Sequence, residues 1–237
     1  MKKLPQSVLI TAGTKRIGFY LAKATLAMGY NAILHYRSSD HAARRWVQRN
    51  PRFREKVFFI RHDLNDSPEI VIERALEFPC TLVGLVNNAS SFLPGNCADS
   101  RHLQEMLNIH LLVPARLGAA FHKHVKNGWI INITDAVIGR PNITWQNYRM
   151  SKLFLEELTR QQAILFAPHC RVNALAPGAM LPAVGNSRAA FNALADKIPL
   201  RKTVSISSLM DAYCFLVKNA DCTGQIVAVD GGWRLTA

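Results

Sequence analysis

The 237-residue sequence predicts a single-domain α/β fold, built on a doubly wound parallel sheet of about seven strands flanked by helices. Short apolar runs rich in β-branched residues alternate along the chain with longer helical patterns. Strands separated by helices require βαβ crossovers, and such crossovers give a parallel sheet. Apolar residues make up 49% of the chain, so it can bury one full core. With no internal repeat or linker, one domain over residues 1–237 is expected.

The individual elements follow from these two patterns. Apolar runs predict strands at 7–11, 31–36, 56–61, 81–87, 128–134, 170–176 and 225–230. Helical patterns fill the gaps near 16–29, 40–49, 67–77, 100–125, 148–167 and 205–219.

The charge balance raises the question of nucleic acid. Lys and Arg number 29 against 16 Asp and Glu, a net charge of +13. The basic residues are scattered, however, with short clusters at Lys2–Lys3, Lys15–Arg16, Arg44–Arg45 and Arg201–Lys202. No continuous basic helix or interleaved aromatic platform is present. We therefore favour a solvated basic surface around a site for an anionic ligand, and expect no nucleic-acid partner.

The cysteine content and the first residues of the sequence indicate the cellular compartment in which the protein works. The five cysteines are odd in number and lack Cys-x-x-Cys spacing, which argues against a disulfide framework and against a zinc site. The opening MKKLPQSVLITAG does not fit a signal peptide, and no run approaches the roughly 18 apolar residues of a membrane span. A reduced, cytoplasmic setting without a membrane or a metal is expected.

A glycine-containing turn, TAGTKRIG (11–18), joins the first strand to the first helix. Such a turn lets the backbone approach a pyrophosphate, while the helix N-terminus supplies N–H donors and a positive dipole end. A glycine turn after a strand is also often only a turn. Its place in a serial βαβ pattern favours nucleotide binding.

The end of the second strand indicates which nucleotide. Folds that bind NAD commonly place an acid there for the ribose hydroxyls, whereas this chain has Arg37 and Ser38, with Arg16 available from the glycine turn. Guanidinium groups grip a phosphate that a carboxylate would repel. NADPH is therefore expected over NADH, unless Arg37 is an ordinary surface arginine.

Tyr148 and Lys152 lie four residues apart, on one face of a predicted helix. Tyr148 is a candidate proton donor, and Lys152 would lower the pKa of the phenol and hold the nicotinamide ribose. The pair could also be an ordinary amphipathic helix face. Asp135 stands thirteen residues before Tyr148 and requires its own explanation.

These motifs, taken in order, resemble the short-chain dehydrogenase/reductases over essentially the whole chain. The further elements of the set are Asp63 in HDLND, NNAS (87–90), Pro177–Gly178 and DGG (230–232). Within that family the sequence is most similar to the pteridine reductases and the bacterial dihydromonapterin or dihydrofolate reductases. Four features carry this likeness: Arg16 in the turn, the HYRSS stretch, NNASSF (87–92), and Asp135 where most relatives have a catalytic Ser.

The resemblance implies a Rossmann-type, NADPH-dependent reductase of a pterin or dihydropterin, of the dihydrobiopterin, dihydromonapterin or dihydrofolate type, giving the tetrahydro form. It also implies a homotetramer and a substrate lid at about 178–202. The cofactor-binding residues would be Thr11, Gly13, Lys15, Arg16, Ile17, Gly18, Tyr36, Arg37, Ser38, Asp63, Leu64, Asn88, Ala89, Ser90, Tyr148, Lys152, Pro177 and Gly178. The substrate would contact Arg16, Ser90, Phe92, Asp135 and Tyr148, and catalysis would rest on Asp135, Tyr148 and Lys152.

Asp135 suits a nitrogen heterocycle better than a ketone. An ionised carboxylate only accepts hydrogen bonds, so it does not replace the neutral hydroxyl that a ketone oxygen needs. A reduced pterin presents an amino group and ring N–H groups, and a ring nitrogen takes up a proton when the adjacent carbon receives hydride. Asp135 could pair with these donors or keep Tyr148 protonated. Alternatively, it only caps the turn at DAVIG.

Several positions carry two interpretations. Phe92 offers a flat face on which the resemblance implies a stacked pterin, but it could be core packing. Ser90 would touch cofactor phosphate or pterin. Ala12 replaces the first glycine of the family's turn, and His110 replaces an Asn that supports Lys152 in many relatives, or is an ordinary helix histidine. In the lid, Met180, Leu181 and Pro182 suggest an apolar wall.

Two other functions remain open from sequence alone. The chain could be a short-chain reductase of another carbonyl or imine. It could also keep the fold without turnover, as a nucleotide-binding regulator or a nucleic-acid-binding protein. The intact Tyr148 and Lys152 favour catalysis.

Overall fold

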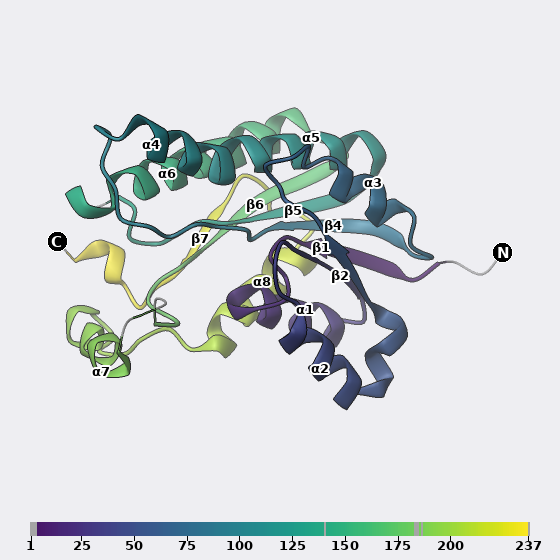
Figure 1. The fold of residues 1–237 in the computed structure, drawn as a ribbon, viewed down its shortest axis with the longest axis horizontal. Helices are drawn as coiled ribbons and strands as arrows, with labels where there is room; N and C mark the ends of the chain where they lie inside the picture. Colours follow the sequence, from purple (N-terminus) through teal and green to yellow (C-terminus); the bar gives the residue numbers. More distant parts are fainter. Residues whose placement is uncertain (1–3, 140, 183–184, 186, 237) are drawn as a thin grey trace.

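The structure, a computed structural model, describes residues 4–139, 141–182, 185 and 187–236. Its centre is one parallel sheet with the strand order β3-β2-β1-β4-β5-β6-β7 (Figure 1). The strands are β1 (Gln6–Ile10), β2 (Asn31–Tyr36), β3 (Val57–Arg61), β4 (Thr81–Asn87), β5 (Gly128–Ile133), β6 (Cys170–Pro177) and β7 (Ile226–Val229). The predicted doubly wound parallel sheet and its seven strands are confirmed, with strand ends within one residue of those expected.

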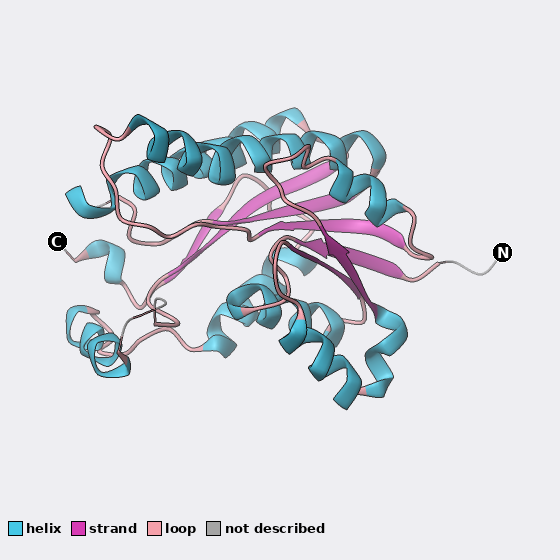
Figure 2. Cartoon of the chain, in the orientation of Figure 1, coloured by secondary structure: helices cyan, strands magenta, loops and turns pink. Residues whose placement is uncertain are grey.

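Helices cover both faces of this sheet (Figures 1 and 2). Helices α3, α4, α5 and α6 lie above it in the view of Figure 1, and α1, α2 and α8 lie below it. The bounds are α1 (Arg16–Ala27), α2 (His41–Arg49), α3 (Ile70–Leu76), α4 (Ser100–Leu107), α5 (Val113–His124), α6 (Gln146–Leu165), α7 (Arg188–Asn192) and α8 (Ile206–Lys218).

The strand order indicates where a crevice for a ligand forms. β1 pairs with both β2 and β4, so the chain crosses from one half of the sheet to the other at this point. Loops that leave the carboxyl ends of strands at such a switch point splay apart and leave a crevice. Buried side chains alternate along β1: Val8 and Ile10 pack into the core below, and Leu9 packs into the core above.

The helical stretch expected near 100–125 is not one regular α-helix. A π-helical segment, Asn108–Leu112, separates α4 from α5. Pro114, in the first turn of α5, has no N–H to donate to the preceding turn, so the regular α-helical ladder does not run through this stretch. A π segment inserts an extra residue into the turn. Here the segment contains the buried His110.

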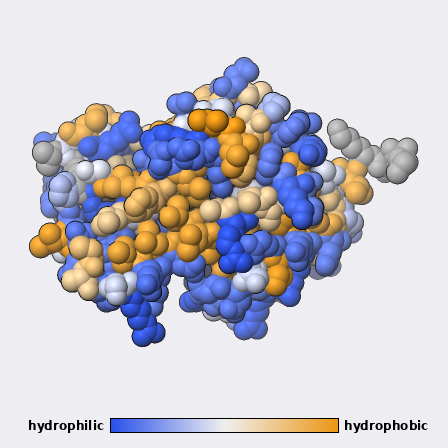
Figure 3. Space-filling model, turned by 90° about the horizontal axis from the view of Figure 1, so that it is seen from above, coloured by the Kyte–Doolittle hydropathy of each residue, from blue (hydrophilic) through white to orange (hydrophobic). Residues whose placement is uncertain are grey.

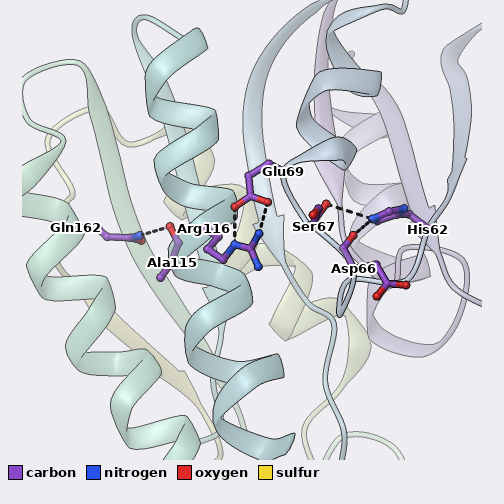
Figure 4. A network of polar contacts seen from close by, with 7 residues as sticks. All are labelled: His62, Asp66, Ser67, Glu69, Ala115, Arg116 and Gln162. Carbon is purple, nitrogen blue, oxygen red and sulfur yellow. Dashed lines mark hydrogen bonds and ion pairs between the residues drawn. The ribbon is translucent and has the colours of Figure 1, made fainter.

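The upper helical layer is joined by polar contacts that also shape the loop after β3 (Figure 4). Arg116 of α5 donates two hydrogen bonds to the Glu69 carboxylate, from Nε to Oε1 at 2.5 Å and from Nη2 to Oε2 at 2.8 Å. As a partly exposed pair it contributes about 0–1 kcal/mol. His62 donates from Nε2 to the carbonyls of Asp66 and Ser67, which closes the turn carrying Asp63 and Leu64.

The outer face of the upper layer is partly apolar. Seen from above, apolar side chains gather in a band across this face (Figure 3). Exposed apolar side chains of the π segment and of α6 are Leu112, Leu153, Phe154, Ile164 and Leu165. Among the described residues, no helix combines the length and the apolar character needed to span a membrane.

Candidate active site

The glycine turn leaves β1 at the switch point and is braced by the end of β4. The Thr11 hydroxyl accepts hydrogen bonds from the backbone N–H groups of Asn88 (2.8 Å) and Ala89 (2.9 Å). The Asn88 amide donates in return to the Thr11 carbonyl at 2.9 Å. A Cβ on Gly18 would lie 2.3 Å from the Ala12 carbonyl, so only glycine allows this close approach. Thr11, Gly13 and Gly18 are buried and support the turn from beneath.

A buried histidine that sequence analysis missed supports the same turn. His35 Nδ1 accepts from the Ala12 N–H at 3.3 Å, while Nε2–H donates to the His62 carbonyl at 3.0 Å. Burial lowers the pKa of His35 to about 4, so the imidazole is neutral and can accept at Nδ1. Ala12 itself has a φ of +48°, the left-handed region that favours glycine. The available sequence signal was a polar side chain inside an apolar strand.

A cavity of about 640 Å³ opens beside this turn, at the ends of β2 and β3. Its lining is rich in basic and hydroxyl groups, with Arg37 and Ser38 both exposed at the end of β2. The nearby Asp40 carboxylate is paired with Arg44 of α2. The predicted cofactor residues that line this cavity are Lys15, Tyr36, Arg37, Ser38, Asp63, Leu64, Ala89 and Ser90.

A second cavity, of about 1110 Å³, adjoins the first and shares Ala12, Lys15 and Ser90 with it. It lies at the carboxyl ends of β4, β5 and β6. The other predicted site residues that line it are Arg16, Ile17, Asn88, Phe92, Asp135, Tyr148, Lys152, Pro177 and Gly178. Residues from far apart in the sequence thus meet in two joined cavities.

Asp135, Tyr148 and Lys152 form a compact group in the second cavity. The Tyr148 hydroxyl donates to Asp135 Oδ2 at 3.0 Å, and Lys152 Nζ donates to the Ile133 carbonyl at 2.7 Å. Tyr148 and Lys152 are buried, on the inner face of α6. The spacing of four residues places both side chains on one face of α6, as predicted, and the structure brings this face to the end of β5.

The electrostatics of this group differ from expectation. Lys152 was expected to lower the pKa of Tyr148, and this is wrong in the structure, because burial and the Asp135 carboxylate raise the pKa of Tyr148 well above its usual value. Burial also raises the pKa of Asp135 and lowers the pKa of Lys152 to about 8. Tyr148 therefore holds its proton at neutral pH, which is the form a proton donor needs.

The two oxygens of Asp135 have different partners. Oδ1 accepts from the Val137 N–H at 2.9 Å, and Oδ2 accepts from Tyr148. Asp135 therefore caps the turn with one oxygen and accepts from Tyr148 with the other. Arg149 of α6 fixes the turn further, because its Nη1 and Nη2 donate to the carbonyls of Val137 (2.7 Å) and Ile138 (2.5 Å).

Phe92 lies at the cavity wall, with 47% of its surface exposed, so it is not core packing. Its ring stacks on Trp145 with centroids 4.0 Å apart and an interplanar angle of 6°. It also meets the Tyr148 ring edge-on at 4.8 Å. Trp145 is a lining residue that sequence analysis missed, although an aromatic side chain three residues before Tyr148 was a usable signal.

His110 is fully buried and hydrogen-bonded at both ring nitrogens. Nδ1 pairs with the Ser151 hydroxyl and Nε2 with the Ser90 hydroxyl, both at 2.8 Å. His110 thus sits behind Ser90, and its ring meets the Tyr148 ring edge-on at 5.5 Å.

Part of the predicted lid, 178–202, lines the second cavity. Residues 183, 184 and 186 lie outside the described residues, as do Lys2 and Lys3. Met180 and Leu181 line the cavity as suggested, and Arg16 donates from Nη2 to the Pro182 carbonyl at 2.9 Å. Two further lining residues, Phe191 and Leu194, come from α7 and the short helical turn after it, which the sequence did not predict.

The end of the chain closes the remaining side. A Cβ on Gly178 would lie 2.8 Å from the Asp230 Cα, so this contact requires glycine. Asp230 accepts from the N–H groups of Gly232 (2.9 Å) and Arg234 (2.8 Å), which folds the DGG turn. The turn places Trp233 in the wall of the second cavity.

Comparison with known proteins agrees with this arrangement. A family model described as enoyl-(acyl carrier protein) reductase matches residues 11–234. The chain belongs to the short-chain dehydrogenase/reductase family. This oxidoreductase family accounts for the Rossmann-type sheet, the glycine turn and the Tyr148–Lys152 pair, in the order in which the chain presents them.

The short-chain dehydrogenase/reductases that this chain resembles include pterin reductases. Pteridine reductase 1 of Leishmania tarentolae is 29% identical, over 96% of this chain and 96% of its own length. Dihydromonapterin reductase of Citrobacter koseri is 30% identical, over 99% of both. Among solved structures, FolM alternative dihydrofolate reductase 1 of Brucella canis, complexed with NADP, superposes with a TM-score of 0.92 at 27% identity, covering 98% of this chain and 94% of that one.

Proposed function

We propose that the protein is an NADPH-dependent reductase that converts a dihydropterin to the tetrahydro form. One observation carries this proposal: Asp135 accepts a hydrogen bond from Tyr148 at the position where a ketone reductase needs a neutral hydroxyl. The similarity to pteridine, dihydromonapterin and dihydrofolate reductases supports it. Dihydrobiopterin, dihydromonapterin and dihydrofolate are the substrates to compare.

The donor set of the first cavity fits NADPH. The N-terminus of α1 has no acidic residue in its first turn, so its N–H groups and dipole favour a pyrophosphate. Arg37 and Ser38 at the end of β2 would hold the 2′-phosphate, with Lys15 beside them. Lys152, Asn88 and the Pro177–Gly178 backbone would border the nicotinamide half in the second cavity. The TM-score of 0.92 to an NADP complex supports this placement.

The residues of the second cavity can then carry out the proton half of the reaction. Bound NADPH supplies a hydride to a ring carbon of the substrate. Tyr148 donates its hydroxyl proton to the adjacent ring nitrogen, which gains the proton as the carbon gains the hydride. Asp135 keeps Tyr148 protonated before the transfer, and Lys152 stabilises the negative charge that develops on the phenol oxygen afterwards.

The aromatic wall gives the substrate its orientation. Phe92 presents a flat, half-exposed ring beside Tyr148, and Trp145 fixes that ring from one side. A pterin stacked on the wall gains on the order of 1 kcal/mol beyond its burial. Phe191, Leu194 and Trp233 add apolar surface that excludes water around the reacting atoms.

We also propose a homotetramer in the cytoplasm. The band of exposed apolar side chains on α6 and the π segment supports association with further copies of the chain, since large exposed apolar patches mark interaction surfaces. Light scattering at micromolar concentration should give about four times the 26.5 kDa chain mass. A mass near 26.5 kDa would reject this assembly.

NADPH oxidation with a panel of acceptors tests the proposed activity. Dihydrobiopterin, dihydromonapterin and dihydrofolate should be reduced with a kcat/KM well above that for simple ketones, imines and enoyl thioesters. Preferential turnover of a ketone or an enoyl thioester would show another reductase of the same family. Salt-dependent retention on DNA or RNA, with no NADPH consumed by any acceptor, would point to a binding protein instead.

A further inference from the structure

His110 and its two serine partners form a buried polar group that the proposed mechanism does not use. His110 lies in the π segment between α4 and α5 and has no exposed surface. Ser151 is equally buried, whereas Ser90 is exposed at the junction of the two cavities. The group therefore connects the protein interior to the point where the two ligands would meet.

The direction of each hydrogen bond in this group follows from counting protons. The Ser151 hydroxyl donates its single proton to the Tyr148 carbonyl at 2.8 Å, because a carbonyl only accepts. Ser151 Oγ must therefore accept from His110, so Nδ1 carries the ring proton. In a neutral imidazole the other nitrogen, Nε2, is then bare. The bond between Nε2 and Ser90 has to be donated by the Ser90 hydroxyl.

Two further observations support the neutral imidazole. His110 is enclosed by protein, and a buried cation would need a counter-charge, whereas the charged group that acts on His110 is the Lys152 ammonium. Burial and this ammonium lower the pKa of His110 well below its usual value. The Ser91 carbonyl could compete for the Ser90 proton, but at 3.5 Å that contact is at the limit of a hydrogen bond.

We propose that His110 fixes the Ser90 hydroxyl as a hydrogen-bond acceptor toward the cavity, so that Ser90 selects an N–H donor of the substrate. With its proton committed to Nε2, Ser90 presents lone pairs, which suit a pterin amino group or ring N–H and oppose a phosphate oxygen. Of the two partners considered for Ser90 from sequence, the pterin is therefore favoured. His110 is a positioning residue in this scheme. The inference rests on the proposed pterin reductase function and deepens it.

The protonation pattern of His110 can be measured without substrate or turnover. In protein labelled with ¹⁵N at histidine, His110 is identified by the signal that disappears in His110→Gln. It should show a protonated Nδ1 and an unprotonated Nε2 at neutral pH. A protonated Nε2, in either the other tautomer or the imidazolium, would overturn the proposal, because Ser90 would then be free to donate.

Selectivity between substrates tests the consequence for Ser90. Wild type should prefer a dihydropterin over analogues methylated at the 2-amino group and at ring N3, with kcat/KM lower by about fivefold to a hundredfold for at least one of them. In Ser90→Ala, kcat/KM for the parent and the methylated substrates should agree within about twofold. Undiminished discrimination in Ser90→Ala would refute the donor-selection role.

Histidine variants separate positioning from folding. His110→Gln should reduce the same discrimination, because an amide can turn either a donor or an acceptor toward Ser90. His122→Gln serves as the control, since His122 lies on α5 stacked on Phe166 and should keep wild-type selectivity. If His110→Gln does not fold, Ser90→Ala still decides, as Ser90 is exposed. If wild type reduces no dihydropterin, the proposed function fails, while the ¹⁵N pattern still decides the state of Ser90.

Discussion

The two joined cavities use charge in opposite ways. The first places Arg37 and Ser38 on an exposed rim, where solvent screens the Arg37 charge and a phosphate can bind reversibly. The second places Tyr148 and Lys152 out of solvent, where burial shifts their pKa values and the protonated Tyr148 donates a hydrogen bond to Asp135. Under the proposed function, the first cavity recognises an anion and the second controls which group holds a proton.

Loss of the Tyr148 hydroxyl, in the second cavity, should produce the largest change, a fall in kcat. In Tyr148→Phe the proton donor is absent, so kcat for dihydropterin should fall by about a hundredfold to ten-thousandfold. The remaining ring keeps its contacts with Phe92 and His110, so the melting temperature should change little. Steady-state kinetics and thermal unfolding measure both. Near-normal turnover by the folded variant would assign proton delivery to another group.

Acid should lower the free energy of unfolding through His35, which supports the glycine turn beside the first cavity. The unfolded chain protonates His35 near pH 6.5, whereas the folded protein holds it neutral to about pH 4. The unfolded state thus binds more protons in this window, and the free energy of unfolding falls as pH falls from 6.5 to 4. The loss is on the order of 3 kcal/mol. Urea unfolding across this range should show a shallower slope in His35→Gln than in wild type.

The exposed His124 of α5 gives the control for that slope. His124→Gln should keep the wild-type pH dependence. His110 contributes in the same direction, because its pKa is also lowered, so some slope remains in His35→Gln. An identical slope in His35→Gln and wild type would mean that His35 does not support the turn as described.

Cofactor choice should depend on the exposed rim of the first cavity. NADPH should bind at least tenfold more tightly than NADH, which is about 1.4 kcal/mol. Arg37→Ala should reduce this preference, and added salt should reduce it in wild type, because the pair is exposed. Fluorescence titration of both cofactors measures it. Arg45→Ala, an exposed arginine of α2, is the matched control, and equal cofactor affinities in wild type would reject the phosphate site.

The smallest expected change is in the free energy of unfolding, on substitution of Ala12, which borders both cavities. Ala12→Gly removes a Cβ from a residue with a φ of +48°, and should stabilise the fold by roughly 0.5–1 kcal/mol. Ala24→Gly, inside α1, should have the opposite sign, because glycine weakens a helix interior. Chemical denaturation of both variants measures the difference. Destabilisation by Ala12→Gly would show that the alanine side chain makes contacts worth more than the backbone strain.

The sheet was predictable because its signals are local. Runs such as NAILHY and TLVGLVN are strands by composition alone, and their order along the chain requires crossovers. Most predicted site residues follow a strand, and parallel strands bring such residues to one edge. The lid helix α7 and the π segment lacked a comparable local pattern.

What the sequence could not supply depends on tertiary neighbours. The stack of Phe92 on Trp145 joins residues 53 positions apart, and the bond from His110 to Ser90 spans 20 positions. The direction of the Tyr148 pKa shift depends on burial and on the Asp135 carboxylate, which both raise it. The neutral state of His35 has the same origin. Tyr148 could be identified as a candidate from the sequence, but the protonation states of Tyr148 and His35 depend on how the folded chain packs around them.

The most direct test of the account compares Asp135→Asn and Asp135→Ser with wild type on a dihydropterin and on a ketone, at pH 5–8. Asparagine can still accept from the Val137 N–H, so it keeps the turn cap and removes only the carboxylate. Both variants should lose dihydropterin kcat/KM by about tenfold to more than a hundredfold, for a loss of roughly 1.5–3 kcal/mol, and Asp135→Ser should gain weak ketone reduction. If both variants fold and keep the wild-type kcat/KM for every dihydropterin across this pH range, Asp135 is only a turn cap and the pterin assignment is contradicted.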